Sequence, residues 1–421
     1  MVEDSTMRGA DLSYIGKKHF IKYGLTALII LIMLVIPMSA GASAAVSAPK
    51  IDAKACIVVD ADTGEVLYEK NADDVLVPAS MTKLMTIYLT LEKINNQKIS
   101  WENSVIIGEY PNKVSRQSSL SSYQLPLGMY FTVHELFYGA VINSSNASAI
   151  ALAGYIGQDE TGFIEMMNDK AKNFGLTDTR FVNSSGLNNI DLMGFHPRGT
   201  AKNEDTKISA RSMATVAYRL INDYPEIIDY SSMTQKTIRE GQPDQIVIKT
   251  TNKLLPTKEY ALNGAMGLKT GYIFNAGYCF AGYTERPEGR LISIVMGATT
   301  SDERFKGSAR LLEYGYTVLK ERAESGGDLT TGSDLGEGLD PVKTLYPDKL
   351  SFYTAKNPVK FILWTICLVK YDKSPESGCK RVGIGVQWVS CRRHCLLWRR
   401  EWVRGSAESS KLNLLARTKN Y

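Results

Sequence analysis

The stretch Pro78-Ala79-Ser80-Met81-Thr82-Lys83-Leu84-Met85 leads into a mostly apolar run with helical spacing, which predicts a helix with Ser80 in its first turn. Ser80 and Lys83 stand three positions apart, so their side chains share a face and come within hydrogen-bonding reach. A serine hydroxyl needs a base to become a nucleophile, and a lysine provides one when desolvation removes its proton. Alone, this spacing is far more often a capping serine beside a solvated lysine.

Short β-rich runs lie on both sides of this stretch in the sequence. The first two flank the turn-forming cluster at residues 60–64 and predict an opening hairpin. Near the other end, three runs predict strands, of which the last two form an antiparallel hairpin. The five expected strands are Ala55 to Val59, Val66 to Tyr68, Ala265 to Thr270, Tyr278 to Thr284 and Leu291 to Ala298.

The middle of the chain reads mostly as helices. Thr132 and Glu135 have the spacing of a capping box, and a second helix is expected from Asn146 to Gly157. A third helix is expected to end at Gly175 as its C-terminal cap, and a closing helix to follow the last strand. Strands at both ends with helices between predict one α+β domain whose sheet joins the N- and C-terminal segments.

Two further motifs accompany Ser80 and Lys83 in the order known for penicillin-binding proteins and β-lactamases: Ser144-Ser145-Asn146 at an inter-helix corner and Lys269-Thr270-Gly271 on a strand. Ser144 can relay a proton near Ser80 and Lys83, and Asn146 can hold a substrate amide. Lys269 and Thr270 can pair with a substrate carboxylate. Gly271 lets an extended substrate lie close to the strand edge, although alone it reads better as a β-bulge glycine.

These motifs and their surroundings resemble the low-molecular-mass D-alanyl-D-alanine carboxypeptidases over roughly residues 52 to 320, one full domain in size. The stretches that carry the resemblance are Pro78-Ala79-Ser80-Met81-Thr82-Lys83, Phe181-Val182-Asn183-Ser184-Ser185-Gly186-Leu187, Ser209-Ala210-Arg211-Ser212-Met213, Gly267-Leu268-Lys269-Thr270-Gly271-Tyr272 and Ala276-Gly277-Tyr278-Cys279. The resemblance implies a β-lactamase/transpeptidase-like domain, with an antiparallel sheet, flanking helices and an all-helical lobe.

The resemblance also implies a reaction. Ser80 would attack the penultimate D-alanine carbonyl, with Lys83 as base, release the terminal D-alanine, and lose its acyl group to water. The backbone amides of Ser80 and Tyr272 would form the oxyanion hole. The expected partners are peptidoglycan stem peptides ending in D-Ala-D-Ala and β-lactams, which mimic that end. One departure from the family pattern is Ser145, where glycine or alanine is more usual.

Three alternatives remain open. A class A β-lactamase is disfavoured because no Glu-x-x-Leu-Asn signature lies between Asn146 and Lys269. A D,D-endopeptidase or transpeptidase uses the same motifs and stays possible. A non-catalytic wall-binding scaffold of the same fold is disfavoured by the intact motifs. No metal or cofactor is predicted, since the histidines and cysteines lack ligand spacing.

The N-terminus has the layout of a secretory signal peptide. Lysines 17, 18 and 22 precede an apolar run from Leu25 to Met38, and small residues follow. The apolar run is shorter than the roughly 20 residues that span a bilayer. We therefore expect residues 1–44 to be a signal peptide and the protein to be exported to the extracytoplasmic face of the membrane or the cell wall.

The rest of the chain divides into a catalytic domain at residues 46–324, a Gly-rich linker at 325–338 and a C-terminal region at 339–421. From residue 360 onward the chain carries 13 Lys and Arg against 4 Asp and Glu, so the net charge of +5 belongs to this region, and nucleic-acid binding by the domain is disfavoured. Four of the five Trp and four of the six Cys also fall here. An altered reading frame is the favoured interpretation, ahead of a membrane-surface segment and a Cys/His metal site.

Overall fold

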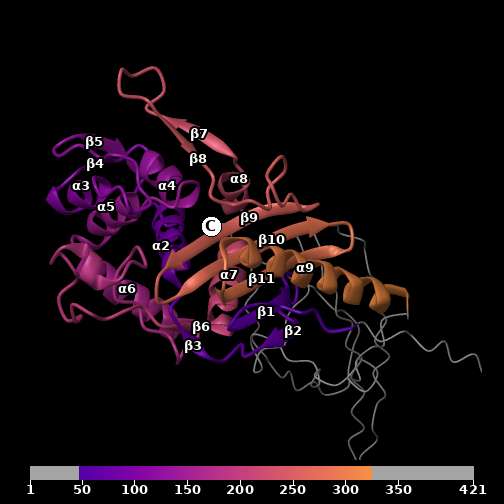
Figure 1. The fold of residues 1–421 in the computed structure, drawn as a ribbon. Coiled ribbons are helices and arrows are strands. Elements are labelled where there is room, and N and C mark those ends of the chain that lie inside the picture. Colours follow the sequence, from indigo (N-terminus) through magenta and orange to yellow (C-terminus); the bar gives the residue numbers. More distant parts are fainter. Residues whose placement is uncertain (1–46, 325–421) are drawn as a thin grey trace, which may run out of the picture. The chain divides into compact units, whose positions relative to one another are not determined.

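The computed structural model describes residues 47–324. Its centre is a five-stranded antiparallel sheet with the strand order β2-β1-β11-β10-β9 (Figure 1). Strand β1 pairs with both β2 and β11, so the two ends of the domain share one sheet, as the sequence predicts. The strands are β1 (Ala55–Asp60), β2 (Val66–Lys70), β9 (Ala265–Ile273), β10 (Gly277–Arg286) and β11 (Gly289–Ala298).

The expected signal peptide at 1–44, the linker at 325–338 and the region at 339–421 lie outside the described residues. Within 47–324, the two cysteines, Cys56 and Cys279, are both free and buried, so they pack as small apolar residues of the core.

Helices cover both faces of the sheet. The closing helix α9 packs on one face, against β1, β10 and β11, while α7 packs on the other. The remaining helices form a lobe beside the edge strand β9 (Figure 1). The helices are α2 (Lys83–Asn95), α3 (Glu109–Ser115), α4 (Val133–Val141), α5 (Asn146–Gly157), α6 (Glu160–Asn173), α7 (Ala210–Asp223), α8 (Ile227–Ser231) and α9 (Ser301–Glu324), with 3-10 helices η1 (Ala79–Thr82) and η2 (Asn189–Leu192).

Three two-stranded ribbons complete the domain. The β7–β8 hairpin projects from the helical lobe in Figure 1. The ribbons pair β3 (Val75–Leu76) with β6 (Ile208–Ser209), β4 (Ser104–Ile106) with β5 (Tyr130–Thr132), and β7 (Gln235–Ile238) with β8 (Ile246–Lys249).

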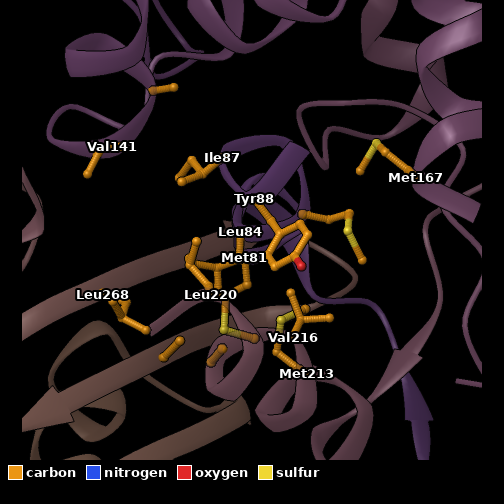
Figure 2. Close-up of a cluster of buried hydrophobic side chains, with 14 of the residues drawn as sticks. Met81, Leu84, Ile87, Tyr88, Val141, Met167, Met213, Val216, Leu220 and Leu268 are labelled. Carbon is orange, nitrogen blue, oxygen red and sulfur yellow. The ribbon is translucent and has the colours of Figure 1, made fainter. Parts of the chain in front are cut away.

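Helix α2 is the central helix of the domain. Its first nine residues are all buried, which is the pattern of a helix surrounded by other elements. Figure 2 shows its side chains in the hydrophobic cluster, with Leu84 and Tyr88 of α2 close to Met213 and Val216 of α7. Because α2 follows η1 directly, this packing fixes the position of the chain at Ser80.

The predicted caps are present. Thr132 and Glu135 form a capping box at the start of α4, and α5 spans the expected residues. Gly175 follows α6 with a positive φ of 76°, as a C-terminal cap requires. The predicted strand at Ala265 is longer than expected, since β9 continues through Gly271 to Ile273.

Candidate active site

Ser80 lies in η1, one short turn before α2 begins, rather than in the first turn of α2. The Nζ atom of Lys83 donates a hydrogen bond to Ser80 Oγ at 2.9 Å. Ser80 is partly exposed, whereas Lys83 is fully buried. The Ser80 hydroxyl, which a substrate can reach, is therefore hydrogen-bonded to the Lys83 amine, which is shielded from water.

Lys83 makes two more hydrogen bonds. Its Nζ donates to Asn146 Oδ1 at 2.6 Å and to the backbone carbonyl of Ser185 at 2.7 Å. Burial, and next the charge of Lys269, hold the pKa of Lys83 well below its ordinary value. A lysine with a depressed pKa can accept a proton near neutral pH.

The loop at residues 183–187 supplies the Ser185 carbonyl. The Asn183 side chain organises this loop, because its Oδ1 accepts from Ser185 N at 3.1 Å and from Gly186 N at 2.7 Å. Gly186 has a φ of 77°, and a Cβ there would lie 2.0 Å from the carbonyl oxygen of Ala79. The sequence marks the loop by its turn residues, but it does not show that the loop reaches Lys83.

Asn146 is the first residue of α5, and both polar atoms of its side-chain amide are hydrogen-bonded. Its Nδ2 donates to the carbonyl of Ser121 at 3.0 Å, while Oδ1 accepts from Lys83. The side chain expected to hold a substrate amide therefore also orients the candidate base. Ser144 is buried in the preceding turn with a φ of 60°, and it is not among the three groups that Lys83 contacts. Its role as a proton relay stays a prediction.

Ser145, the departure from the family pattern, is the N-cap of α5. Its side chain accepts from Ser148 N at 3.1 Å and from Ser148 Oγ at 2.8 Å, and it is fully buried. The Ser145 hydroxyl therefore caps the N-terminus of α5.

We expect Ser145→Ala to lower the free energy of unfolding by ~1 kcal/mol, because an N-cap hydrogen bond is lost. Thermal or urea unfolding measures this change. The rate of acylation by a β-lactam should stay at the wild-type level, and a tenfold loss of that rate without a loss of stability would contradict the capping role.

Strand β9 runs past η1 with Lys269, Thr270 and Gly271 at its centre. A Cβ on Gly271 would lie 2.7 Å from the carbonyl oxygen of Pro78, so glycine allows β9 to approach the nucleophile turn. The β9–β10 register shifts only near Tyr283 and is regular at Gly271. This regular pairing argues against a β-bulge at Gly271. Thr270 Oγ1 lies 2.7 Å from Thr251 Oγ1.

Lys269 is buried, and burial followed by the charge of Arg304 lowers its pKa to about 7. Arg304, in the first turns of α9, donates from Nη1 to the carbonyl of Gly271 at 3.1 Å. Sequence reasoning missed Arg304, since its position beside the buried face of α9 gives no sign of the strand it reaches. Lys269 and Arg304 thus bring two basic side chains to β9, a setting that favours an anionic group.

Tyr272 follows the Lys-Thr-Gly motif and is half exposed. Its ring stacks on Tyr278 of β10 with centroids 4.3 Å apart. The assignment of the Ser80 and Tyr272 backbone amides to an oxyanion hole stays a prediction.

Known proteins are similar to this chain over most of the described domain. The family model described as D-alanyl-D-alanine carboxypeptidase matches residues 42–300. The chain belongs to this family. It is 32% identical over 268 residues to D-alanyl-D-alanine carboxypeptidase DacF of Bacillus subtilis, covering 63% of this chain and 62% of that protein. It is 34% identical over 301 residues to DacC of Escherichia coli, covering 70% and 69%. The match to the Bacillus protein thus spans less than two thirds of its length.

Solved structures show the same fold. One is a peptidoglycan synthesis regulatory factor (PBP3) from Streptococcus pneumoniae, at a TM-score of 0.60 and 34% identity, with 63% of this chain and 73% of that chain covered. Another is penicillin-binding protein D2 from Listeria monocytogenes in its ampicillin-bound form, at a TM-score of 0.55 and 31% identity, covering 64% and 100%. The domain of this family member is therefore the β-lactamase/transpeptidase-like fold expected from the resemblance.

Residues 47–324 contain no helix with the length and apolar character needed to cross a membrane. The same part of the chain has no cluster of three or more His, Cys, Asp or Glu side chains arranged to hold a metal ion.

Proposed function

We propose that this family member is a serine D-alanyl-D-alanine carboxypeptidase, which removes the terminal D-alanine from peptidoglycan stem peptides through an acyl-enzyme at Ser80. The observation that carries the proposal is the 2.9 Å hydrogen bond between Ser80 Oγ and a buried Lys83. Burial lowers the pKa of that lysine, so it can take the serine proton.

In the proposed reaction, Ser80 Oγ attacks the carbonyl carbon of the penultimate D-alanine while its proton passes to Lys83. The backbone N–H groups of Ser80 and Tyr272 would stabilise the oxyanion that forms. The C–N bond then breaks, the amine of the leaving D-alanine takes the proton, and an ester remains on Ser80. Water hydrolyses this ester, with the proton returning through Lys83 and, as we predict, Ser144.

In this proposal the terminal carboxylate of the substrate lies beside Thr270. Lys269 and Arg304 supply positive charge beside Thr270, whose hydroxyl is partnered by Thr251. A carboxylate would gain charge-assisted hydrogen bonds there. Gly271 leaves the edge of β9 open to an extended peptide, and Asn146 can hold an amide of that peptide.

The Listeria relative bound to ampicillin supports β-lactams as acylating ligands of this chain too. Peptidoglycan lies outside the cytoplasm, so the proposed activity fits an exported protein with a signal peptide at residues 1–44. Contact of the C-terminal region with a membrane surface is part of the same proposal and lies outside the described residues.

The test uses the purified protein. We expect it to release D-alanine from an N-acylated tripeptide ending in D-Ala-D-Ala, and preincubation with ampicillin to block the release. Intact-mass spectrometry should show one bound penicilloyl group, and peptide mapping should place it on Ser80. A protein that neither releases D-alanine nor takes the label would refute the proposal and favour a wall-binding scaffold. Cleavage only of cross-linked peptides would favour an endopeptidase.

A further inference from the structure

Glu160 is a buried carboxylate that belongs to none of the motifs. It is the first residue of α6 and is 7% exposed. Acidic side chains in a first helical turn usually serve the helix end. Here Asp159 already does so, since its side chain accepts from Gly162 N at 2.8 Å as the N-cap. The burial of Glu160 therefore needs another explanation.

Two hydrogen bonds that the Glu160 side chain accepts come from the loop beside the candidate base. Its Oε1 accepts from Ser184 N at 2.8 Å and from Ser184 Oγ at 2.5 Å. The carbonyl of Ser184 is held from the opposite side, because Thr86 Oγ1 of α2 donates to it at 2.7 Å. The peptide unit before Ser185 is thus fixed between α6 and α2.

The next carbonyl along the chain, that of Ser185, accepts from Lys83 Nζ at 2.7 Å. The contacts run from the Glu160 carboxylate through Ser184 and Ser185 to the amine of Lys83. Each polar group in this path is buried. In such an interior a misplaced carbonyl costs more than it would in water.

Tyr110 on α3 is the titratable group that faces Glu160 from a neighbouring element. Burial raises the pKa of Glu160, and burial together with the charge of Glu160 raises the pKa of Tyr110 well above its ordinary value. Asp159 is the other nearby acid. The charged group that faces Lys83 is Lys269 on β9.

We propose that Glu160 is a positioning residue for Lys83, which fixes Ser184 by two hydrogen bonds and so holds the Ser185 carbonyl against the lysine amine. The proposal rests on the proposed function, because it takes Lys83 as the base that activates Ser80.

The test compares Glu160→Ala with Glu160→Gln. Alanine removes both hydrogen bonds to Ser184, whereas the glutamine amide oxygen can still accept them. Glu165→Gln is the matched control, since Glu165 is an exposed carboxylate on the same helix. The measurement is the second-order rate constant for acylation by a fluorescent penicillin from pH 5 to 9, corrected for the fraction of folded protein.

We expect Glu160→Ala to lower the plateau of this rate at least about tenfold, because misplacement of a catalytic group is costly. The acidic limb of the profile should move to lower pH, since the Ser185 carbonyl stabilises the protonated form of Lys83 and its loss lowers the lysine pKa further. Glu160→Gln should recover most of the rate and leave the limb in place. Glu165→Gln should match the wild type.

A Glu160→Ala protein with an unmoved limb and a wild-type rate per folded molecule would overturn the proposal. The same holds if alanine and glutamine are equally impaired, because then the hydrogen bonds to Ser184 are not what matters. Nitrogen-15 NMR titration of the lysine amines gives a readout that needs no activity. If Ser80 takes no penicillin at all, the proposed function fails, while a Lys83 pKa that shifts in Glu160→Ala and not in Glu160→Gln still supports the positioning role.

Discussion

Lys83→Met is expected to lower the rate of Ser80 acylation by a β-lactam at least about 10³-fold, because it removes the base that takes the serine proton. Methionine has a similar length and no charge, so it fits the buried space without needing the three acceptors that Lys83 uses. Burying a lysine is itself costly. The variant loses that cost, but the buried Asn146 Oδ1 and Ser185 carbonyl lose their donor, so it should unfold at a temperature near that of the wild type.

The measurement pairs stopped-flow acylation with thermal unfolding, and Ser80→Ala sets the floor of the acylation signal. In the wild type the rate should fall as the pH drops through the depressed pKa of Lys83, since the protonated amine cannot accept the serine proton. In Lys83→Met this dependence should vanish. A variant that is acylated at the wild-type rate at pH 8 would exclude Lys83 as the base.

The features of this fold that the sequence predicts correctly are mostly those decided by local patterns of residues. The capping box at Thr132 and Glu135 and the C-terminal glycine at Gly175 are decided by residues a few positions apart, and the structure confirms both. The opening hairpin and the β10–β11 hairpin are also local. The sharing of one sheet by both ends follows from the order of the elements.

The parts of the site that sequence reasoning missed depend on contacts between distant segments. The Ser185 carbonyl reaches Lys83 across 102 positions, and the Glu160 side chain reaches Ser184 across 24. Arg304 reaches the carbonyl of Gly271 across 33 positions. A motif gives the residue types at a site, but a backbone carbonyl has no signature in the sequence, so its partners appear only when the chain is folded.

Gly186→Ala is expected to lower the free energy of unfolding by about 2–5 kcal/mol, from a strained positive φ and a steric clash. The added Cβ would lie 2.0 Å from the carbonyl oxygen of Ala79, which is backbone and cannot rotate away. Either η1 or the loop at residues 183–187 must then move. Since Ser80 lies on η1 and the Ser185 carbonyl on the loop, either movement breaks the contact between Lys83 and its surroundings.

Gly175→Ala separates the cost of backbone strain from the cost of the steric clash. Gly175 has nearly the same φ, 76° against 77°, and a Cβ there meets nothing within 4 Å. It should lose about 1–2 kcal/mol of stability from backbone strain alone and keep the wild-type acylation rate per folded molecule. Gly186→Ala should lose more stability and, in the molecules that remain folded, at least about 10²-fold in acylation rate. Urea unfolding measures the stability, and the rate of acylation by a fluorescent penicillin, per folded molecule, measures the activity. Equal losses in the two variants would show that the contact between the loop at residues 183–187 and η1 does not position Ser80.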